Sequence, residues 1–344
     1  MGDGKYVFVG YCAANNLSEV TREQARKLTH LNIAFGIVED GAITVERIKD
    51  QLGYYVKKIQ GYNPALNILL STGGGALSQR PCHGEATRTP EGIERIVSST
   101  MDAVRAYNMD GVDCDWEFPG WSGNRDERFQ HTALMKAYRA ALDAYAAGRG
   151  RPCFLTIAAG CSDTYIDNVE LNELAVYLDF INLMCYDFRW EGTLTGHQCN
   201  TFAPLDDAGG SSAENGLNNY IAKGYPRDKL VLGAAFYSHR YDGVQGGGNG
   251  YGQPYTGRYT YGPTYTDISL KYEKSAYFAK YWDDAAKEPW LFDGDSFITY
   301  DDPMAMRFKC EYVKAMGLRG VMYWEHGGDR THALFNAIYD HLML

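Results

Sequence analysis

The feature that most constrains the fold of this chain is a series of eight short apolar runs separated by segments of good helix formers. Nearly unbroken hydrophobicity over a strand's length is typical of strands buried on both faces of a parallel sheet. The runs are Tyr6–Tyr11, Leu31–Gly36, Leu66–Ser71, Gly111–Phe118, Phe154–Gly160, Phe180–Tyr186, Leu230–Tyr237 and Gly320–Glu325. The clearest helical segments are Thr21–Leu28, Gly92–Ala106, Phe129–Ala147 and Pro303–Met316.

This alternation predicts an α/β protein, a closed (β/α)8 barrel, with a doubly wound open sheet as the alternative. An open sheet of that kind carries a Gly-rich phosphate-binding turn after its first strand. Residues 11–15, Tyr-Cys-Ala-Ala-Asn, are no such turn. A capping-box pattern at Thr21 and Gln24 supports the start of the first helix.

A Gly- and Tyr-rich stretch interrupts the alternation after the seventh run. Over residues 241–262, Gly and Tyr make up 13 of 22 positions. We therefore expect a barrel over residues 1–240 and 299–344, and an insertion with its own small fold over residues 241–298. The alternative is a flexible glycine loop. Aromatic residues at helical spacing between positions 272 and 282 favour an ordered second half.

The charge and composition of the chain exclude some classes of binding partner. Lys and Arg number 33 against 43 Asp and Glu, a formal net charge of −10. Nucleic acid and anionic membranes are poor partners for such a chain, because both are bound through basic clusters. No apolar run approaches the roughly 18 residues of a membrane span. Aromatic residues make up 14% of the chain, and this excess suits a neutral polyhydroxylated ligand.

The N-terminus and the cysteines leave the compartment open. Residues 1–5 lack the basic region and long apolar stretch of a secretory signal peptide. We expect a secreted protein whose leader is not part of this sequence, with an intracellular location as the alternative. The eight cysteines show no CxxC spacing, so a zinc site is not expected. The sequence is compatible with one or two disulfides.

The segment that carries chemistry is Asp110–Glu117, Asp-Gly-Val-Asp-Cys-Asp-Trp-Glu. Side chains alternate faces along a strand, so Asp113, Asp115 and Glu117 point the same way. Inside a barrel these three carboxyls face the axis. The opposite face, toward the helices, carries Val112, Cys114 and Trp116.

Three carboxyls about 7 Å apart along one face repel each other when all are ionised. At least one therefore keeps a proton at neutral pH, as a general acid must. Glu117 lies nearest the carboxyl end of the strand, where barrel enzymes have their active sites. We assign the acid role to Glu117, with Asp115 as its charge partner and Asp113 as deeper support.

Two other interpretations of this segment are an exposed strand and a metal site. An exposed strand with one solvated acidic face fits poorly, because the alternate positions are apolar and bulky. Aligned carboxylates also bind Mg²⁺ or Ca²⁺. No histidine or further carboxylate cluster accompanies them nearby in the sequence, so we expect no metal.

The same segment resembles the DxxDxDxE signature of glycoside hydrolase family 18, the chitinases. Other segments resemble further motifs of the family, in the family's order and over nearly the whole chain. They are Ser71–Gly74 (SxGG), Met184–Asp187 (MxYD), Phe236–Arg240 (an aromatic–Arg segment), Thr299–Pro303 (the lead-in to the final helix) and Gly320–Glu325 (the last strand with its Trp).

The resemblance implies substrate-assisted hydrolysis of β-1,4-linked N-acetylglucosamine chains, without a cofactor. Glu117 would protonate the leaving oxygen and later act as base on water. Asp115 would orient the substrate's 2-acetamido group, which is the nucleophile. Tyr186 would hydrogen-bond the acetamido oxygen, and Asp187 would bind the distorted sugar. Two displacements imply retention at the anomeric carbon.

The resemblance also implies a set of substrate-binding residues. Trp324 would form the floor under the cleaved sugar, and Tyr11 and Ser71 would contact Asp113. Arg240 would clamp a sugar or pair with Asp187. Phe35 and Met184 would pack near the acetamido pocket, Gly74 and Tyr237 belong to the matched motifs, and Trp190 and Trp121 are candidate outer platforms.

The chain departs from the family pattern at Gly75, where many processive members carry a Trp. One aromatic platform is therefore not expected there. The insertion over residues 241–298 resembles the family's α+β insertion but is short and rich in Gly and Tyr, so we expect a shallower cleft wall and weaker processivity. Two alternatives stay open beside chitinase: an endo-β-N-acetylglucosaminidase acting on N-glycan chitobiose cores, and a non-catalytic chitin-binding lectin. The presence of Glu117 argues against the lectin, and Trp324 with the insertion favours the chitinase. We expect a monomer.

Overall fold

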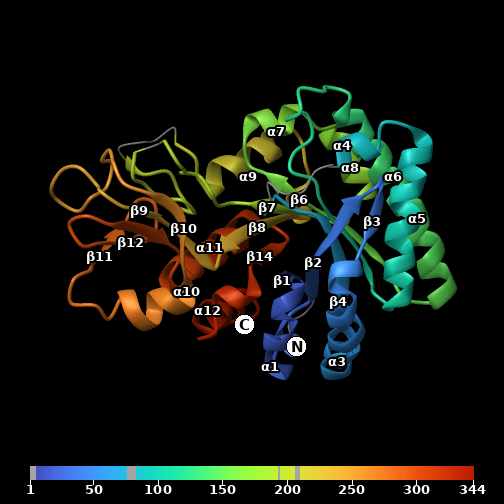
Figure 1. Cartoon of the computed structure of the whole chain (residues 1–344), viewed down its shortest axis with the longest axis horizontal. Helices are drawn as coiled ribbons and strands as arrows, with labels where there is room; N and C mark the ends of the chain where they lie inside the picture. Colours follow the sequence, from blue (N-terminus) through green and yellow to red (C-terminus); the bar gives the residue numbers. More distant parts are fainter. Residues whose placement is uncertain (1–4, 76–82, 193, 206–209) are drawn as a thin grey trace.

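A computed structural model describes residues 5–75, 83–192, 194–205 and 210–344 (Figure 1). Eight parallel strands form a sheet in the order β1-β14-β8-β7-β6-β5-β4-β2, and pairing of β1 with β2 closes it into a barrel. The strands are β1 (Val7–Ala13), β2 (His30–Glu39), β4 (Asn67–Gly73), β5 (Gly111–Asp115), β6 (Phe154–Gly160), β7 (Phe180–Met184), β8 (Leu230–Ala235) and β14 (Gly320–Trp324). The predicted (β/α)8 barrel is confirmed.

Helices surround the barrel, and local signals set where several of them begin and end. Thr21 accepts from the Gln24 backbone N–H while Gln24 accepts from the Thr21 backbone, which is the predicted capping box. The α-helices are α1 (Arg22–Lys27), α2 (Lys49–Gln51), α3 (Lys57–Tyr62), α4 (His83–Ala86), α5 (Pro90–Ala106), α6 (Glu127–Arg149), α7 (Asp163–Asp167), α8 (Leu171–Tyr177), α9 (Ala213–Ala222), α10 (Tyr265–Asp267), α11 (Pro303–Met316) and α12 (Ala333–Leu342). None of the described helices is long and apolar enough to cross a membrane.

The apolar core has two parts, one outside and one inside the barrel. Val112, Cys114 and Trp116 belong to the large cluster between strands and helices, as the alternation along β5 predicts. The inner cluster fills the barrel itself. Its buried members are Val7, Val9, Tyr11, Phe180, Val231 and Met322. Because these side chains fill the interior, the barrel is a packed core, and function is confined to its rim.

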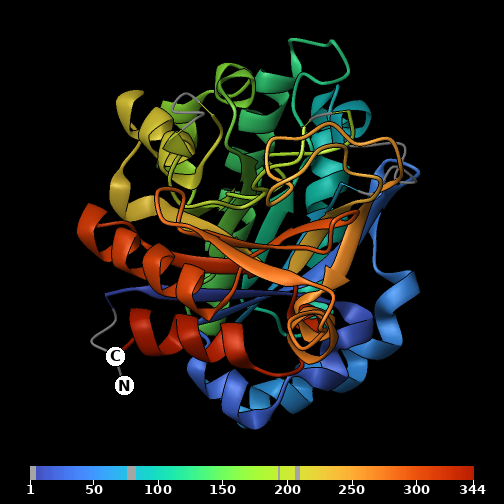
Figure 2. The same cartoon turned by 90° about the vertical axis from the view of Figure 1, so that its left-hand side faces the viewer.

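A second sheet lies beside the barrel, on the left in Figure 1, and its orange strands cross in front of the barrel in Figure 2. It is antiparallel, in the order β10-β9-β13-β12-β11. Its strands are β9 (Tyr237–Tyr241), β10 (Tyr259–Thr264), β11 (Ala279–Asp283), β12 (Glu288–Phe292) and β13 (Phe297–Tyr300). Its own core is mostly aromatic: Tyr241, Val244, Trp290, Phe292 and Phe297.

The second sheet differs from the sequence-based prediction in one respect. Tyr281 and Trp282 lie on β11, where they pair with Trp290 and Pro289 of β12, and not on a helix. The helical spacing of the aromatic residues was therefore misleading, because packing between strands overrode it. β9 begins before residue 241 and β13 continues past residue 298. The division of the chain at 241–298 stays a proposal.

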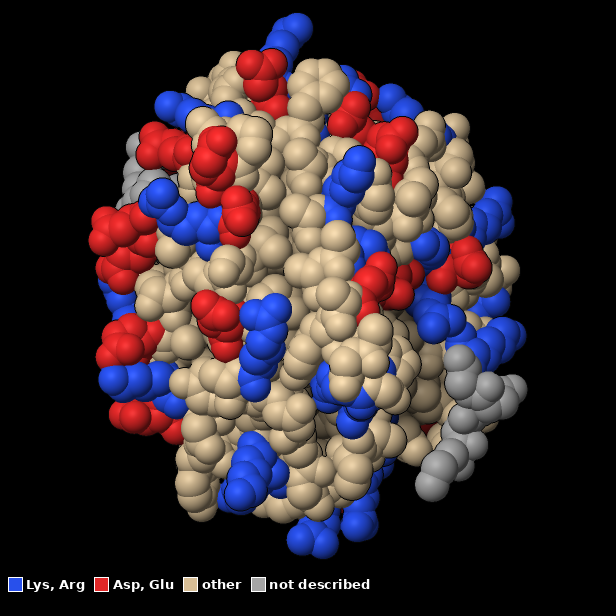
Figure 3. Space-filling model, turned by 90° about the vertical axis from the view of Figure 1, so that its right-hand side faces the viewer, with Lys and Arg blue, Asp and Glu red and all other residues tan. Residues whose placement is uncertain are grey.

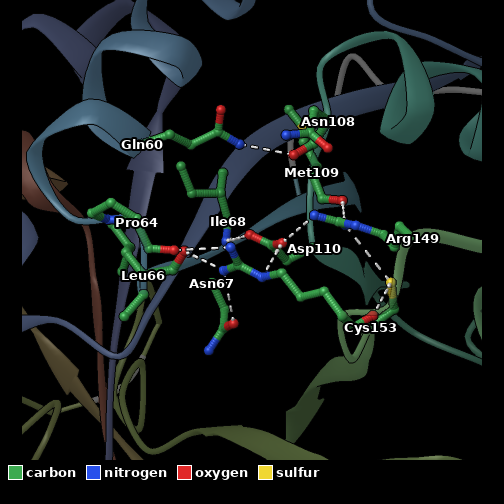
Figure 4. A network of polar contacts seen from close by, with 12 residues as sticks. Gln60, Pro64, Leu66, Asn67, Ile68, Asn108, Met109, Asp110, Arg149 and Cys153 are labelled. Atoms are coloured by element: carbon green, nitrogen blue, oxygen red, sulfur yellow. Dashed lines mark hydrogen bonds and ion pairs between the residues drawn. The ribbon is translucent and has the colours of Figure 1, made fainter. Parts of the chain in front are cut away.

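A polar network at the opposite end of the barrel from the rim fixes the start of β5 (Figure 4). Asp110, 1% exposed, accepts from Arg149 Nη2 at 2.9 Å, from the Ile68 backbone N–H at 2.9 Å, and pairs with Arg151 Nε at 3.0 Å. Such charge-assisted contacts to a buried carboxylate restrict strand register. The network therefore holds in place the strand that carries the three carboxyls.

Charges and cysteines complete the description. On the face shown in Figure 3, basic and acidic side chains are interspersed. The seven cysteines within the described ranges are all free thiols, and the closest pair of sulfurs, in Cys161 and Cys185, lies 3.6 Å apart. Cys82 lies outside the described residues.

Candidate active site

The three carboxyls of the acidic segment follow one another up the barrel toward its carboxyl end. β5 ends at Asp115 and not at Phe118, because the strand pairing stops where the Gly74 backbone N–H donates to the Asp115 carbonyl at 2.8 Å. Glu117 therefore lies in the segment just after the strand. The carboxyl ends of barrel strands form the rim that carries the active sites of this fold.

Asp113 is the deepest carboxyl and is fully buried. Its Oδ2 accepts from Tyr11 Oη at 2.9 Å and from Ser71 Oγ at 2.7 Å. Its Oδ1 accepts from Thr156 Oγ1 at 2.6 Å and from Asn182 Nδ2 at 3.2 Å. Burial raises the pKa of Asp113, and these four donors offset only part of that rise. Because all four groups donate to it, the geometry favours the ionised carboxylate.

Asp115 and Glu117 are neighbouring carboxyls, and each affects the pKa of the other. Their charges repel each other, so the two do not both ionise readily. Burial, followed by the charges of Glu117 and Asp113, raises the pKa of Asp115 well above its ordinary value. Burial and the charge of Asp187 raise the pKa of Glu117 to about 7. The pair therefore keeps a proton at neutral pH.

Gly75 contacts the Glu117 carboxyl from the loop after β4. Its backbone N–H donates to the Glu117 carboxyl and lowers the pKa of that group. A Cβ built on Gly75 would lie 2.6 Å from Glu117 Oε2, closer than real Cβ atoms approach an oxygen. Gly75 is thus required for the position that Glu117 occupies here.

We expect Gly75→Ala to lower kcat by about tenfold or more, because displacing an acid by about 1 Å costs up to about 10²-fold. The thermal midpoint should change little, since Gly75 is exposed. Steady-state kinetics and a melting curve measure both. Gly61→Ala is the matched control, because nothing lies within 4 Å of a Cβ at that helical position. Unchanged kcat in Gly75→Ala would contradict the contact.

Tyr186 and Asp187 follow β7 and face the carboxyl pair. Burial and the charges of Asp115, Asp187 and Glu117 raise the pKa of Tyr186 well above its ordinary value, so its hydroxyl keeps its proton and can donate. Asp187 adopts a left-handed conformation with φ 59°. Its carboxylate accepts from Tyr237 Oη at 2.6 Å and lies 2.8 Å from His239 Nε2.

Aromatic rings form a floor beside the carboxyls. Trp324, at the end of β14, stacks on Phe35 with centroids 5.5 Å apart and planes inclined by 20°, and it contacts the Tyr11 ring at 5.9 Å. Gly74 has φ +93°, and a Cβ there would lie 2.7 Å from the Phe35 ring, so only glycine fits. Met184 packs with Trp324 on the inner core.

The predicted contact between Arg240 and Asp187 is not present. Arg240 Nε pairs instead with Asp242 at 2.7 Å, and its Nη2 donates to Ser296 Oγ at 3.0 Å. Neighbouring side chains on a strand point to opposite faces. Tyr237 and His239 therefore face Asp187 together, and Arg240 faces away.

The two candidate outer platforms are exposed. Trp121 is 63% exposed and packs edge-on against Phe118, at 4.8 Å between centroids. Trp190, just after the Tyr186–Asp187 segment, is 49% exposed. Large exposed rings at the rim can stack on a sugar.

Sequence reasoning missed four residues that the structure brings to the site. Thr156 on β6 and Asn182 on β7 donate to Asp113. His239 lies at Asp187, and Tyr261 Oη donates to Asp187 Oδ2 at 3.4 Å. The signal for Thr156 and Asn182 was visible, because each is a lone polar residue within an apolar run. A buried polar residue needs a partner, and Asp113 is a partner of both.

One other cluster resembles a metal site. Ligand atoms of Cys199, Glu288 and Asp301 lie within 4.8 Å of one another, all buried. Lys309 Nζ donates to Asp301 Oδ1 at 2.6 Å and to the Cys199 carbonyl at 2.7 Å. The ammonium thus takes the place that a cation would need. This cluster is an internal ion-pair network between the second sheet and α11.

A closed barrel with two neighbouring carboxyls of raised pKa, Asp115 and Glu117, at the carboxyl end of its strands is the arrangement of a barrel glycoside hydrolase. The model of the family "Glycosyl hydrolases family 18" matches residues 7–329. The chain belongs to this family.

Proteins of similar sequence and solved structures of similar fold support this assignment to the family. Chitinase A1 of Niallia circulans is 35% identical over 305 residues, 82% of this chain and 43% of that protein. Chitotriosidase-1 of Mus musculus is 30% identical over 86% of this chain and 66% of its own length. The chain thus spans between 43% and 66% of the length of these two relatives.

Among solved structures, a family 18 N-acetylglucosaminidase from Paenibacillus barengoltzii superposes with a TM-score of 0.92 at 41% identity, covering 98% of this chain and 100% of that one. A class V chitinase of Nicotiana tobaccum, solved with NAG4, has a TM-score of 0.88 at 25% identity, covering 98% and 99%. The neighbours of this fold therefore include both chitinases and an N-acetylglucosaminidase.

Proposed function

We propose that the protein hydrolyses β-1,4-linked N-acetylglucosamine polymers and oligomers with retention, using the substrate's own 2-acetamido group as nucleophile. The observation that carries the proposal is the row of carboxyls, Asp113, Asp115 and Glu117, that rises along β5 to the carboxyl rim of the barrel, where β14 ends at Trp324. The apolar face of a sugar can stack on such a ring, and we expect this stacking to bring a glycosidic oxygen within reach of Glu117.

In the first step Glu117 gives its proton to the leaving glycosidic oxygen. The acetamido carbonyl oxygen attacks the anomeric carbon as the C–O bond breaks, which leaves an oxazolinium-type intermediate. Asp115 accepts from the acetamido N–H, and the protonated hydroxyl of Tyr186 donates to the acetamido oxygen. Both contacts orient a nucleophile that shares a ring with the reacting carbon, so attack is intramolecular.

In the second step the ionised Glu117 removes a proton from water, which opens the intermediate from the face that the leaving group vacated. Two inversions give net retention. Asp113 takes no proton in this scheme, because four donors hold it as a carboxylate. Its fixed charge favours a proton on the Asp115–Glu117 pair when substrate binds.

A second candidate is the release of single N-acetylglucosamine units. It is favoured by the 41% identity to the Paenibacillus N-acetylglucosaminidase over that protein's full length. Gly75 is exposed and occupies the position at which many processive members of the family carry a Trp. The lack of that aromatic platform fits short substrates as well. Cleavage of N-glycan cores has no comparable support. Weaker processivity and an extracellular location stay predictions.

Chitotetraose, a high-mannose glycoprotein and cellotetraose, each incubated with the full chain, separate these functions. Mass spectrometry should show cleavage of chitotetraose alone, because cellotetraose lacks the acetamido nucleophile. Dimer as the first product supports a chitinase, and monomer as the first product supports the second candidate. Cleavage of cellotetraose at a similar rate would exclude the substrate-assisted mechanism for both.

The pH dependence follows from the pKa of Glu117, which burial raises to about 7. The first step needs the protonated carboxyl, so activity should be full below that value and be lost as the pH rises through it. We expect kcat/KM on chitotetraose to fall about tenfold per pH unit above pH 7 to 8. A profile that is flat up to pH 10 would contradict this assignment.

A further inference from the structure

Two cysteines lie side by side at the carboxyl rim of the barrel. Cys161 directly follows β6, and Cys185 directly follows β7. Both are free thiols, and their sulfurs lie 3.6 Å apart. Cys161 Sγ also donates to the Met184 carbonyl at 3.4 Å, so the Cys185 thiol is the donor between the two sulfurs. The proposed mechanism uses neither sulfur.

The pairing of the strands places the two cysteines opposite each other. β6 and β7 run parallel, and Gly160 pairs with Met184, so Cys161 and Cys185 are the next residues along the two chains. Neighbouring strands lie about 4.8 Å apart. A disulfide needs Cα atoms about 4.4–6.8 Å apart. The spacing of the backbones therefore suits a covalent bond between the two sulfurs.

The pair can be reached from the side of Cys161. Cys161 is half-buried, whereas Cys185 has no exposed surface. The hydrogen bond from Cys185 and burial raise the pKa of the Cys161 thiol, so little thiolate is present at neutral pH. The first reaction of Cys161 with a small oxidant should therefore be slow, but the second sulfur already lies in place to complete the bond.

We propose that Cys161 and Cys185 form a site of reversible oxidative modification, at which hydrogen peroxide converts two thiols into a disulfide that lowers activity. The peroxide oxidises Cys161 to a sulfenic acid and is itself reduced to water. The Cys185 sulfur then attacks the sulfenic sulfur. The S–S bond forms as the hydroxyl leaves with the thiol proton as a second water. A dithiol reductant restores both thiols and becomes a disulfide itself.

The backbone at Cys161 is held in place by α9. A Cβ built on Gly216 would lie 2.7 Å from Cys161 Cβ. Tyr220 Oη donates to the Gly160 carbonyl at 2.9 Å. Little room is left there for a shift of the chain. When the sulfurs approach from 3.6 Å to about 2.05 Å, part of the movement therefore falls on Cys185.

Cys185 lies between two residues of the candidate active site. Met184 packs with Trp324 on the inner core, and Tyr186 carries the hydroxyl that we expect to meet the acetamido oxygen. A displacement of about 1 Å in a positioning group costs up to about 10²-fold in rate. The disulfide should therefore lower kcat. This effect on kcat rests on the proposed function, whereas formation of the disulfide does not.

Peptide mapping detects the bond without any assay of activity. The full chain is treated with hydrogen peroxide, remaining thiols are blocked with iodoacetamide, and the chain is digested without reductant. Mass spectrometry should show the peptides of Cys161 and Cys185 joined, about 2 Da below the sum of their masses, because two hydrogens are lost. Two blocked thiols, or oxygen acids of Cys161 without a link to Cys185, would overturn the proposal.

Hydrolysis of chitotetraose tests the consequence for activity. Peroxide should lower kcat by about tenfold or more, and dithiothreitol should restore it. The reversal separates this effect from oxidation of methionines such as Met184, because methionine sulfoxide needs its own reductase enzymes. A cross-linked protein with unchanged kcat would overturn the inhibitory part of the proposal.

Cys161→Ser removes one of the two sulfurs and keeps a donor toward the Met184 carbonyl. It should keep kcat within a factor of about two and should resist peroxide. Cys153→Ser is the matched control, because Cys153 is buried and its sulfur lies 3.9 Å from Arg149 Nη1, in the polar network at the opposite end of the barrel. This control should stay as sensitive to peroxide as the unaltered chain.

If peroxide lowered kcat equally in Cys161→Ser and in the unaltered chain, another residue would be the one oxidised, and the inhibition could not be assigned to this pair. If the chain cleaved no N-acetylglucosamine oligomer, the proposed function would fail. The peptide map would still decide whether the bond between Cys161 and Cys185 forms.

Discussion

Replacing Glu117 with glutamine is expected to lower kcat on chito-oligosaccharides by about 10²–10⁴-fold, the usual contribution of a general acid. The amide has nearly the same shape but carries no transferable proton. The thermal midpoint should stay within about 2 °C. Burial raises the pKa of this carboxyl because a buried charge is unfavourable, and the neutral amide of glutamine carries no charge. Binding of chitotetraose, measured by calorimetry, should persist.

The matched control is Glu94→Gln, the same substitution at an exposed position on α5. It should leave kcat within a factor of about two. A Glu117→Gln protein that keeps more than about a tenth of the activity would show that another group supplies the proton.

Replacing Asp113 with alanine is expected to destabilise the fold by about 2–4 kcal/mol and to abolish most activity. The substitution removes the common acceptor of four buried donors, and each stranded donor costs about 1–3 kcal/mol. One of these donors keeps a partner, because Asn182 Nδ2 also donates to Tyr11 Oη at 3.1 Å. The total is therefore smaller than the sum.

Urea denaturation measures this loss. Thr156→Val is the control, since it removes one donor and keeps the side-chain shape, and about 1 kcal/mol is expected. The ratio of the two losses in unfolding free energy tests whether four donors share the Asp113 carboxylate. If Asp113→Ala cost no more than Thr156→Val, the four-donor description of this carboxylate would be wrong.

The barrel and its acidic strand could be predicted because both follow from local patterns. Unbroken apolar runs of strand length mark strands buried on both faces, and alternation along residues 110–117 puts three carboxyls on one side. These two conclusions need only the period of a strand and the direction of the chain. The role of Trp324 was implied by the resemblance to the family, and the structure puts this residue at the end of β14.

What could not be predicted depends on contacts between segments distant in the sequence. The choice between Arg240 and His239 at Asp187 depends on the register of β9 within the second sheet, and a shift of one residue reverses the face. The strand at Tyr281 was hidden by helical spacing, because only its pairing with β12 shows the strand. The donors to Asp113 come from β1, β4, β6 and β7, which meet only in the closed barrel.

In the proposed mechanism the substrate supplies the attacking oxygen, while Glu117 serves as acid and then as base. Time-resolved proton NMR of chitotetraose hydrolysis, read before mutarotation, distinguishes this mechanism from direct attack by water. We expect the newly formed reducing end to appear first as the β-anomer. The α-anomer as first product would mean direct attack by water and would contradict the mechanism.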